Sequence, residues 1–179
     1  FEDDKITNGF LKTLSHLHLG QDVISIWIDA NLDNVAVMPD LFANIRGIAV
    51  PPHLERNRVA EEAAEVVKLG LEKQSTVSRH LAFLRESGFP DNVGLSVTTF
   101  LVRNHANERV RRANTTWWDV ISGGVRRDQL SFDFALWSSG ITAEWLNVYW
   151  RKTNNLFSRR SHKRGRGRLL QPDRHQEPS

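Results

Sequence analysis

Two oxygen-bearing side chains, Asp29 and Asn31, follow a run of β-branched and aromatic residues at positions 23–28. Side chains two positions apart at a strand end point the same way. Carboxylate and amide oxygens suit hard cations such as Mg²⁺ or Mn²⁺. A metal held there would bridge two phosphates and neutralise a leaving diphosphate as a Lewis acid. The alternative is a turn, because Asp and Asn also end strands by bonding their own backbone, and spacing alone favours the turn.

A second unusual stretch is a glycine pair at 123–124 followed by Arg127, Asp128 and Gln129. The glycines end one predicted helix, and Asp128 lies in the first turn of the next, where backbone N–H groups are free and carry partial positive charge. Asp128 is either a helix cap or a carboxylate that deprotonates a hydroxyl or accepts hydrogen bonds from sugar hydroxyls. Spacing leaves both interpretations open.

Two further candidates have favoured structural alternatives. His53 and Arg56 follow a predicted strand that ends at Pro51, so His53 is a candidate ligand or donor and Arg56 a candidate phosphate partner, although a solvated loop explains both. Trp118 belongs to a tryptophan pair on an amphipathic helix, where packing in the core is the usual role. One of the two rings is a candidate platform for a sugar.

Strands alternate with helices along the chain, which predicts an α/β fold. The run at 23–28 is almost free of polar residues, as is typical of a strand buried on both faces in a parallel sheet. Ligands bind outside the carboxyl ends of strands in such sheets, which is where Asp29 lies. Further strands are predicted at 45–50, 93–102 and 143–149, and helices at 8–19, 56–87 with a division at Gly70, 106–122 and 127–138.

Length and charge divide the chain into a domain at 1–150 and a basic tail at 151–179. The tail carries nine Lys and Arg against two acids, a net charge of +7, which leaves −4 for the domain in a chain of +3 overall. A basic tail of this composition is expected to be disordered. The acidic domain argues against a specific nucleic-acid partner. Any contact with an anionic surface is expected to be made by the basic tail.

Several function classes are excluded or disfavoured by absent residues and motifs. The 179 residues contain no cysteine, which excludes thiolate ligands and a cysteine nucleophile and fits a reducing, cytoplasmic compartment. No apolar run approaches the roughly 20 residues of a membrane-spanning helix. The chain has no HExxH, G-x-S-x-G, Walker or G-x-G-x-x-G motif.

Together these segments resemble a glycosyltransferase-like family that includes the plant turgor-regulation-defect and mucilage-related proteins and bacterial relatives. The most specific block is the tryptophan pair followed by RDQLSF. The matching segments are 12–16 (KTLSH), 25–31 (SIWIDAN), 88–90 (GFP) with 94–95 (GL), 101–105 (LVRNH), 117–118 (WW) and 127–132 (RDQLSF).

The resemblance implies a GT-A-like fold, a mixed sheet flanked by helices, here without its N-terminal nucleotide-binding strands. It implies a nucleotide-sugar donor, a glycan or polysaccharide acceptor, and Mn²⁺ or Mg²⁺ as cofactor. The residues that it marks are Asp29 and Asn31 for the metal, Asp128 and Gln129 for catalysis, and Lys12, His53, Arg56, Trp118 and Arg127 for the donor or substrate.

Two alternatives remain beside an active transferase. The chain begins just before the metal motif, so one is a truncated, non-catalytic remnant of such a domain. The other is a protein that binds nucleic acid or an anionic surface through residues 151–179.

Overall fold

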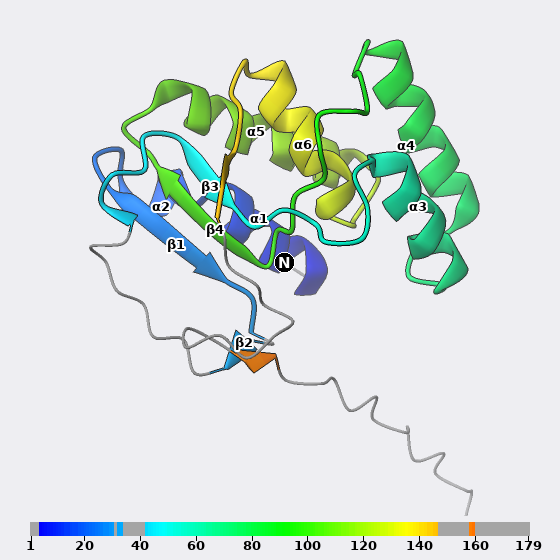
Figure 1. Ribbon diagram of the computed structural model, residues 1–179, viewed down its shortest axis with the longest axis horizontal. Coiled ribbons are helices and arrows are strands. Elements are labelled where there is room, and N and C mark those ends of the chain that lie inside the picture. The colour runs from blue at the N-terminus through cyan, green and yellow to red at the C-terminus, as the bar shows by residue number, and fades with distance from the viewer. Residues whose placement is uncertain (1–3, 31, 34–41, 147–157, 160–179) are drawn as a thin grey trace, which may run out of the picture.

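The computed structural model describes residues 4–30, 32–33, 42–146 and 158–159 (Figure 1). Its helices are α1 (Asp4–Thr13), α2 (Ser15–Leu19), α3 (Val59–Lys68), α4 (Gln74–Glu86), α5 (Glu108–Gly123) and α6 (Gln129–Ser138). Its strands are β1 (Ile24–Ile28), β2 (Leu32–Asp33), β3 (Ile48–Val50), β4 (Phe100–Asn104), β5 (Glu144–Trp145) and β6 (Ser158–Arg159). None of the helices in these ranges is long and apolar enough to cross a bilayer.

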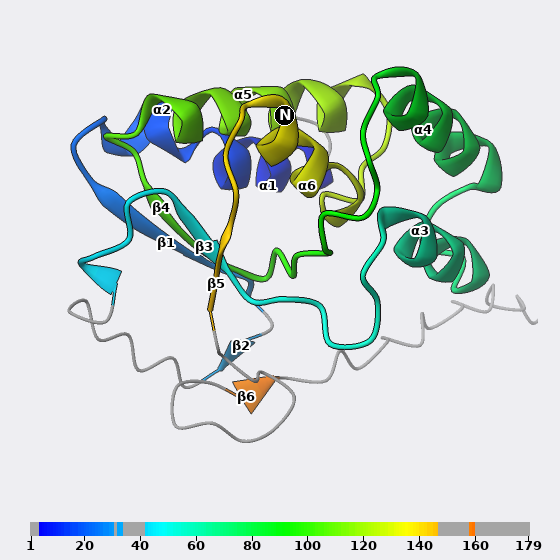
Figure 2. The ribbon, with the colours of Figure 1, turned by 45° about the horizontal axis from the view of Figure 1, so that its top comes forward.

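Four of the strands form one mixed sheet in the order β1-β4-β3-β5. β4 runs antiparallel to both β1 and β3, whereas β3 and β5 are parallel. Figure 2 shows α1, α2, α5 and α6 on one side of this sheet and the small β2–β6 ladder on the other. The mixed sheet with flanking helices confirms the predicted α/β class and is consistent with a GT-A-like fold.

Strand alternation divides the core between the two faces of the sheet. Ile48, Val50 and Leu101 pack on one face against Trp117 of α5 and Phe132 of α6. The intervening residues pack on the opposite face with Leu32 and Phe42; these are Ala49, Phe100 and Val102. α3 and α4 form a hairpin beside the sheet and share a third core with α6 (Figure 1). The predicted division of 56–87 near Gly70 is confirmed, because α3 ends at Lys68 and α4 begins at Gln74.

The prediction that 23–28 is a doubly buried strand of a parallel sheet was wrong. β1 is the edge strand and pairs only with the antiparallel β4 among the described residues, so Ile24 remains 38% exposed. The predicted strand at 93–102 begins only at Phe100, because the preceding segment bonds to the loop at 51–53: Val97 N–H donates to Pro51 O and His53 N–H to Leu95 O.

Two further predicted elements differ from the observed ones in their boundaries. The single helix predicted at 8–19 is interrupted at Leu14, which separates α1 from α2. The strand predicted at 143–149 comprises Glu144–Trp145, and residues 147–149 lie outside the described part of the chain. The disorder predicted for the tail also concerns residues beyond the described ones, apart from Ser158–Arg159.

Two glycines should respond to alanine with opposite signs. Gly94 has φ +96°, and a Cβ there would lie 3.1 Å from Cζ2 of Trp145. We expect Gly94→Ala to lower the free energy of unfolding by about 1–3 kcal/mol. Gly123 ends α5 with nothing within 4 Å of a built Cβ, so Gly123→Ala should raise it by about 0.5–1 kcal/mol. Urea unfolding measures both, and equal effects would contradict this account.

Candidate functional site

Antiparallel pairing places Asp29 at the junction between β1 and the chain that enters β4. Its backbone N–H donates to the carbonyl of Thr99 at 2.9 Å. Trp27 lies two residues earlier, on the same side of the strand, and its indole Nε1–H donates to Oδ1 of Asp29 at 2.7 Å. The Asp29 carboxylate is therefore held by its own strand, with 28% of its side chain exposed.

Asp128 caps α6 and is fixed from several directions. Its Oδ1 accepts from Gln129 N–H at 3.0 Å, and its Oδ2 accepts from the Thr98 hydroxyl at 3.1 Å. The indole N–H of Trp117 donates to its backbone carbonyl at 2.8 Å. Asp128 has helical backbone angles, φ −55° and ψ −37°, whereas a typical N-cap residue is extended, so the capping interpretation applies only to its bond with the first N–H of α6. The bond from Thr98 and the ion pair described next give the carboxylate partners that a solvent-exposed cap lacks.

Lys12 of α1 joins the two carboxylates. Its ammonium lies 3.3 Å from Oδ1 of Asp29 and 2.5 Å from Oδ2 of Asp128, and its side chain is 4% exposed. The same nitrogen lies 5.8 Å from the ring centroids of Trp27 and of Trp117, within range of a cation–π attraction. Three distant parts of the chain therefore meet at one buried positive charge.

The backbone of Lys12 is itself anchored by a buried arginine. Nη1 of Arg103 donates to the Lys12 carbonyl at 2.6 Å and to Oδ1 of Asn114 at 3.4 Å. Arg103 is 1% exposed, and burial lowers its pKa to about 10, so the guanidinium stays charged at neutral pH. This bond fixes the end of α1 against β4 and sets where the Lys12 side chain begins.

The charge state of Asp128 results from two opposing effects. Burial disfavours the carboxylate and would raise its pKa, but the charge and hydrogen bond of Lys12 outweigh it, with help from Thr98 and Arg127. The pKa of Asp128 is held below its ordinary value, so the group is ionised at neutral pH. It is a good acceptor of hydrogen bonds and a weak base.

The two carboxylates and Lys12 line a cavity of about 220 Å³. Its other walls come from Asn8 and Gly9 in the middle of α1, from Leu71 and Glu72 between α3 and α4, and from Arg126 and Arg127 before α6. The volume suits one sugar ring or a diphosphate, which is less than a whole nucleotide sugar. Within the described part of the chain, Nε of Arg127 and Nε2 of Gln129 are buried donors that find no hydrogen-bond partner, an arrangement that favours a ligand with acceptor oxygens.

Of the residues marked by sequence, Lys12, Asp29, Arg127 and Asp128 line this cavity, and Gln129 adjoins it through its backbone bond to Asp128. Asn31 lies outside the described residues. Trp118 is not among the lining residues. It packs edge-to-face on Phe10, with ring centroids 5.4 Å apart, so it joins α5 to α1 instead of presenting a free face here.

His53 and Arg56 form a separate cluster with Glu62 of α3 and do not line the cavity. Nδ1 of His53 accepts from the backbone N–H groups of Glu55 and Arg56. Nε of Arg56 donates to Oε2 of Glu62 at 2.7 Å, and Glu62 is 6% exposed. These contacts stabilise the loop between β3 and α3. The side chains of His53 and Arg56 are 7% and 22% exposed, so the solvated loop of the alternative interpretation does not describe them either.

Among the residues of the site that sequence reasoning missed are Trp27, Thr98 and Arg126. Trp27 could have been found from its position two residues before Asp29 on a strand. Thr98 had no such signal, because it lies in a stretch interpreted as strand.

The described residues supply only part of a metal site. They contain no group of three His, Cys, Asp or Glu side chains that would hold an ion. Asp29 lines the cavity, and Mg²⁺ in proteins is commonly held by one or two carboxylates together with substrate phosphates. The donor set thus fits a cation that arrives with a diphosphate, and does not fit a resident ion held by protein ligands alone.

Comparison with known protein families gives a match over most of the chain. The family model described as TOD1/MUCI70, glycosyltransferase-like domain, matches residues 1–162. No curated protein and no solved structure matches the chain.

Proposed function

Because the chain belongs to the TOD1/MUCI70 glycosyltransferase-like domain family, we propose that it transfers a sugar from a nucleotide-sugar donor to a hydroxyl of a glycan or polysaccharide. The observation that carries the proposal is the Lys12 ammonium between the Asp29 and Asp128 carboxylates, in a cavity that also holds Arg126 and Arg127. Cations bind phosphate oxygens and carboxylates accept hydrogen bonds from hydroxyls, so this combination suits an anionic, hydroxyl-rich ligand.

In the proposed reaction, the acceptor hydroxyl oxygen forms a bond to the anomeric carbon of the donor. The bond from that carbon to the phosphate oxygen breaks, and the nucleoside diphosphate leaves with the electron pair. Asp128 accepts a hydrogen bond from a sugar hydroxyl and orients it. Since its pKa is lowered, Asp128 is a weak base, and the hydroxyl proton passes to the departing diphosphate.

Cationic and neutral donors stabilise the charge that develops on the diphosphate. Lys12, Arg126 and Arg127 supply positive charge, and the forked guanidinium groups suit phosphate oxygens. Gln129 offers its buried Nε2–H groups, which have no partner among the described residues, to a sugar oxygen. Preorganised donors of this kind are worth about 10²–10³ in rate each when they face the transition-state charge.

The proposed cofactor is Mn²⁺ or Mg²⁺, held by Asp29 and Asn31 together with the donor diphosphate. When bound, the ion supplies Lewis-acid neutralisation of the leaving group. The protein's part is to aim the Asp29 carboxylate, which the Trp27 indole and the Thr99 carbonyl do through the bonds described above.

Ligand-induced stabilisation tests the donor site. We expect one nucleoside-diphosphate sugar, at 100 times its Kd with Mn²⁺, to stabilise the wild type by about 2.7 kcal/mol. The shift should shrink without metal and vanish in Asp29→Ala, because that variant loses the proposed metal ligand. Differential scanning fluorimetry measures the effect across a panel of nucleotide sugars.

Asp22→Ala is the matched control, because Asp22 is an exposed aspartate just before the same strand. It should keep the full shift. If no nucleotide sugar raises the melting temperature of the wild type with either metal, the proposed donor site is wrong.

A further inference from the structure

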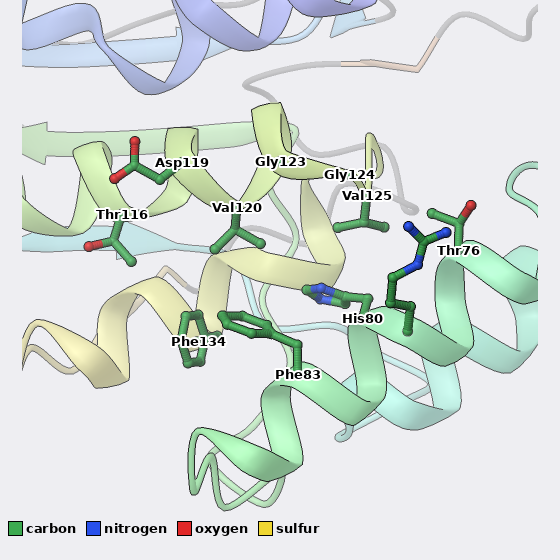
Figure 3. Close-up of a pocket in the computed structure, with 11 residues that line it drawn as sticks. Thr76, His80, Phe83, Thr116, Asp119, Val120, Gly123, Gly124, Val125 and Phe134 are labelled. Carbon is green, nitrogen blue, oxygen red and sulfur yellow. The ribbon is translucent and has the colours of Figure 1, made fainter.

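A larger cavity of about 610 Å³ lies on the other side of the α5–α6 connection (Figure 3). It is bounded by α4, by the last turns of α5 and by residues 123–125, and it shares no lining residue with the cavity at Asp128. Its volume falls within the range of about 300–1,000 Å³ that is usual for small-molecule sites. Neither the site described above nor the proposed transfer reaction uses it.

The floor of this cavity is aromatic. His80 and Phe83 of α4 lie with ring centroids 6.2 Å apart and planes inclined by 30°. Phe134 of α6 meets Phe83 edge-to-face at 5.2 Å. Figure 3 shows Val120 and Val125 on the opposite side of the space from these rings. A slot between flat rings and branched aliphatic side chains fits a planar ring better than a bulky, hydroxylated one.

His80 behaves as a neutral wall of the slot. It is 7% exposed, and burial lowers its pKa. Its Nε2 lies 3.0 Å from the carbonyl oxygen of Leu130, which can only accept, so Nε2 carries the proton and donates. The imidazole is thereby fixed in orientation and adds no charge to the cavity wall.

The polar rim carries one cation and one anion. Arg79 is exposed on α4 and forms no ion pair with the residues that the structure describes. Asp119 also lines the cavity, but its carboxylate points away from the aromatic rings in Figure 3. With the Asp119 carboxylate turned away from the rings, Arg79 supplies the positive charge among the lining residues, and the hydroxyls of Thr76 and Thr116 add neutral donors and acceptors.

We propose that this cavity binds a planar aromatic compound with an acidic substituent, the ring between Phe83 and Val120 and the acid at Arg79. The site stands beside the proposed transfer site and does not depend on glycosyl transfer. A binding experiment without any donor therefore tests it alone.

The test uses two fluorescent probes that share the same rings. One is 1-anilinonaphthalene-8-sulfonate, which carries an acid, and the other is N-phenyl-1-naphthylamine, which does not. We expect the wild type to bind the sulfonate with a Kd on the order of 10 μM. Arg79→Gln should raise the Kd of the sulfonate by about threefold, which is the size expected for an exposed charge pair. The Kd of the neutral probe should not change.

A variant that fills the cavity gives the decisive comparison. Gly123→Leu places a side chain where a built Cβ meets nothing within 4 Å, at the end of a helix, so the fold has room for it. This variant should weaken the binding of both probes at least tenfold, because a ligand would have to overpack a space that the leucine already occupies. Ser122→Leu is the matched control, because the same leucine one residue earlier does not line the cavity.

Each outcome decides the proposal. Loss of binding in Gly123→Leu with retention in Ser122→Leu supports the cavity as the site. Equal binding of the sulfonate by both leucine variants, or no binding by the wild type, overturns it. An unchanged sulfonate Kd in Arg79→Gln overturns the acidic part of the proposed ligand.

Discussion

Lys12→Met is expected to reduce sugar transfer by about 100-fold or more and to destabilise the fold by about 2–3 kcal/mol. The substitution keeps the length of the side chain but removes the charge between Asp29 and Asp128. Removing one partner of a buried ion pair leaves the opposite charge unpaired, which typically costs 3–5 kcal/mol. The cost here is smaller, because the two carboxylates are 28% and 30% exposed. The loss of rate follows from the loss of one preorganised cation.

A double-mutant cycle separates the charge effect from lost packing. Asp128→Asn removes one of the two carboxylates, so Lys12→Met should cost less stability in that background than in the wild type. Lys68→Met is the control: Lys68 is 74% exposed and pairs with Glu65 on the surface, so it should change stability by less than about 0.5 kcal/mol. Additive costs in the cycle would show that Lys12 is not coupled to the charge of Asp128, although its pairing with Asp29 would remain.

Acid is expected to weaken the fold through His105. Burial first, then the charges of Arg103, His16 and Arg111, lowers the pKa of His105 to about 4. An unfolded chain takes up this proton near pH 6.5, so the contribution of His105 to stability is complete above that pH. It is lost as the pH falls from about 6.5 to 4, and at 1.36 kcal/mol per pKa unit it amounts to about 3 kcal/mol.

The measurement is urea unfolding of the wild type and His105→Gln at pH values from 7.5 to 4. The difference between the two free energies of unfolding should shrink by about 3 kcal/mol over this range. Taking the difference matters, because Asp133 changes stability in the opposite direction: burial raises its pKa to about 6. Asp133 titrates in both proteins and cancels.

His18→Gln, at an exposed position of α2, is the control for the substitution itself. A stability profile of His105→Gln that runs parallel to that of the wild type from pH 7.5 to 4 would mean that His105 does not carry the acid sensitivity.

Local patterns predicted the helices and part of the site. Helical spacing located α5 and α6 to within about two residues, and the glycine pair at 123–124 marked the break that puts Asp128 at a helix start. Asp29 was found because it follows a strand. The helices, the break at 123–124 and the position of Asp29 all depend on residues close together in sequence, and apolar periodicity reports on such short segments.

The pairing across the site was not predictable from spacing. Lys12 and Asp128 are 116 positions apart, and their contact depends on how α1 packs against α5. Trp117 was interpreted as core, which it is, but its indole also supports Asp128. The resemblance marked His53 and Arg56 as donor-site residues. Both instead pair with Glu62, a few residues further along the chain, in a local cluster away from the cavity.

The small ladder between β2 and β6 ties the start of the tail to the neighbourhood of Asp29. The carbonyl of Asp29 accepts from Leu32 N–H at 3.0 Å, and Leu32 pairs with Arg159. Two residues from near the C-terminus thus close a loop of more than a hundred residues, a contact that a truncation can remove without touching the domain core. A deletion that begins at residue 158 therefore takes away the partner of β2, whereas one that begins at 160 keeps it. The deletion from 160 removes most of the charge of the tail but keeps β6. Comparing it with the deletion from 158 therefore shows what β6 itself contributes to the position of Asp29.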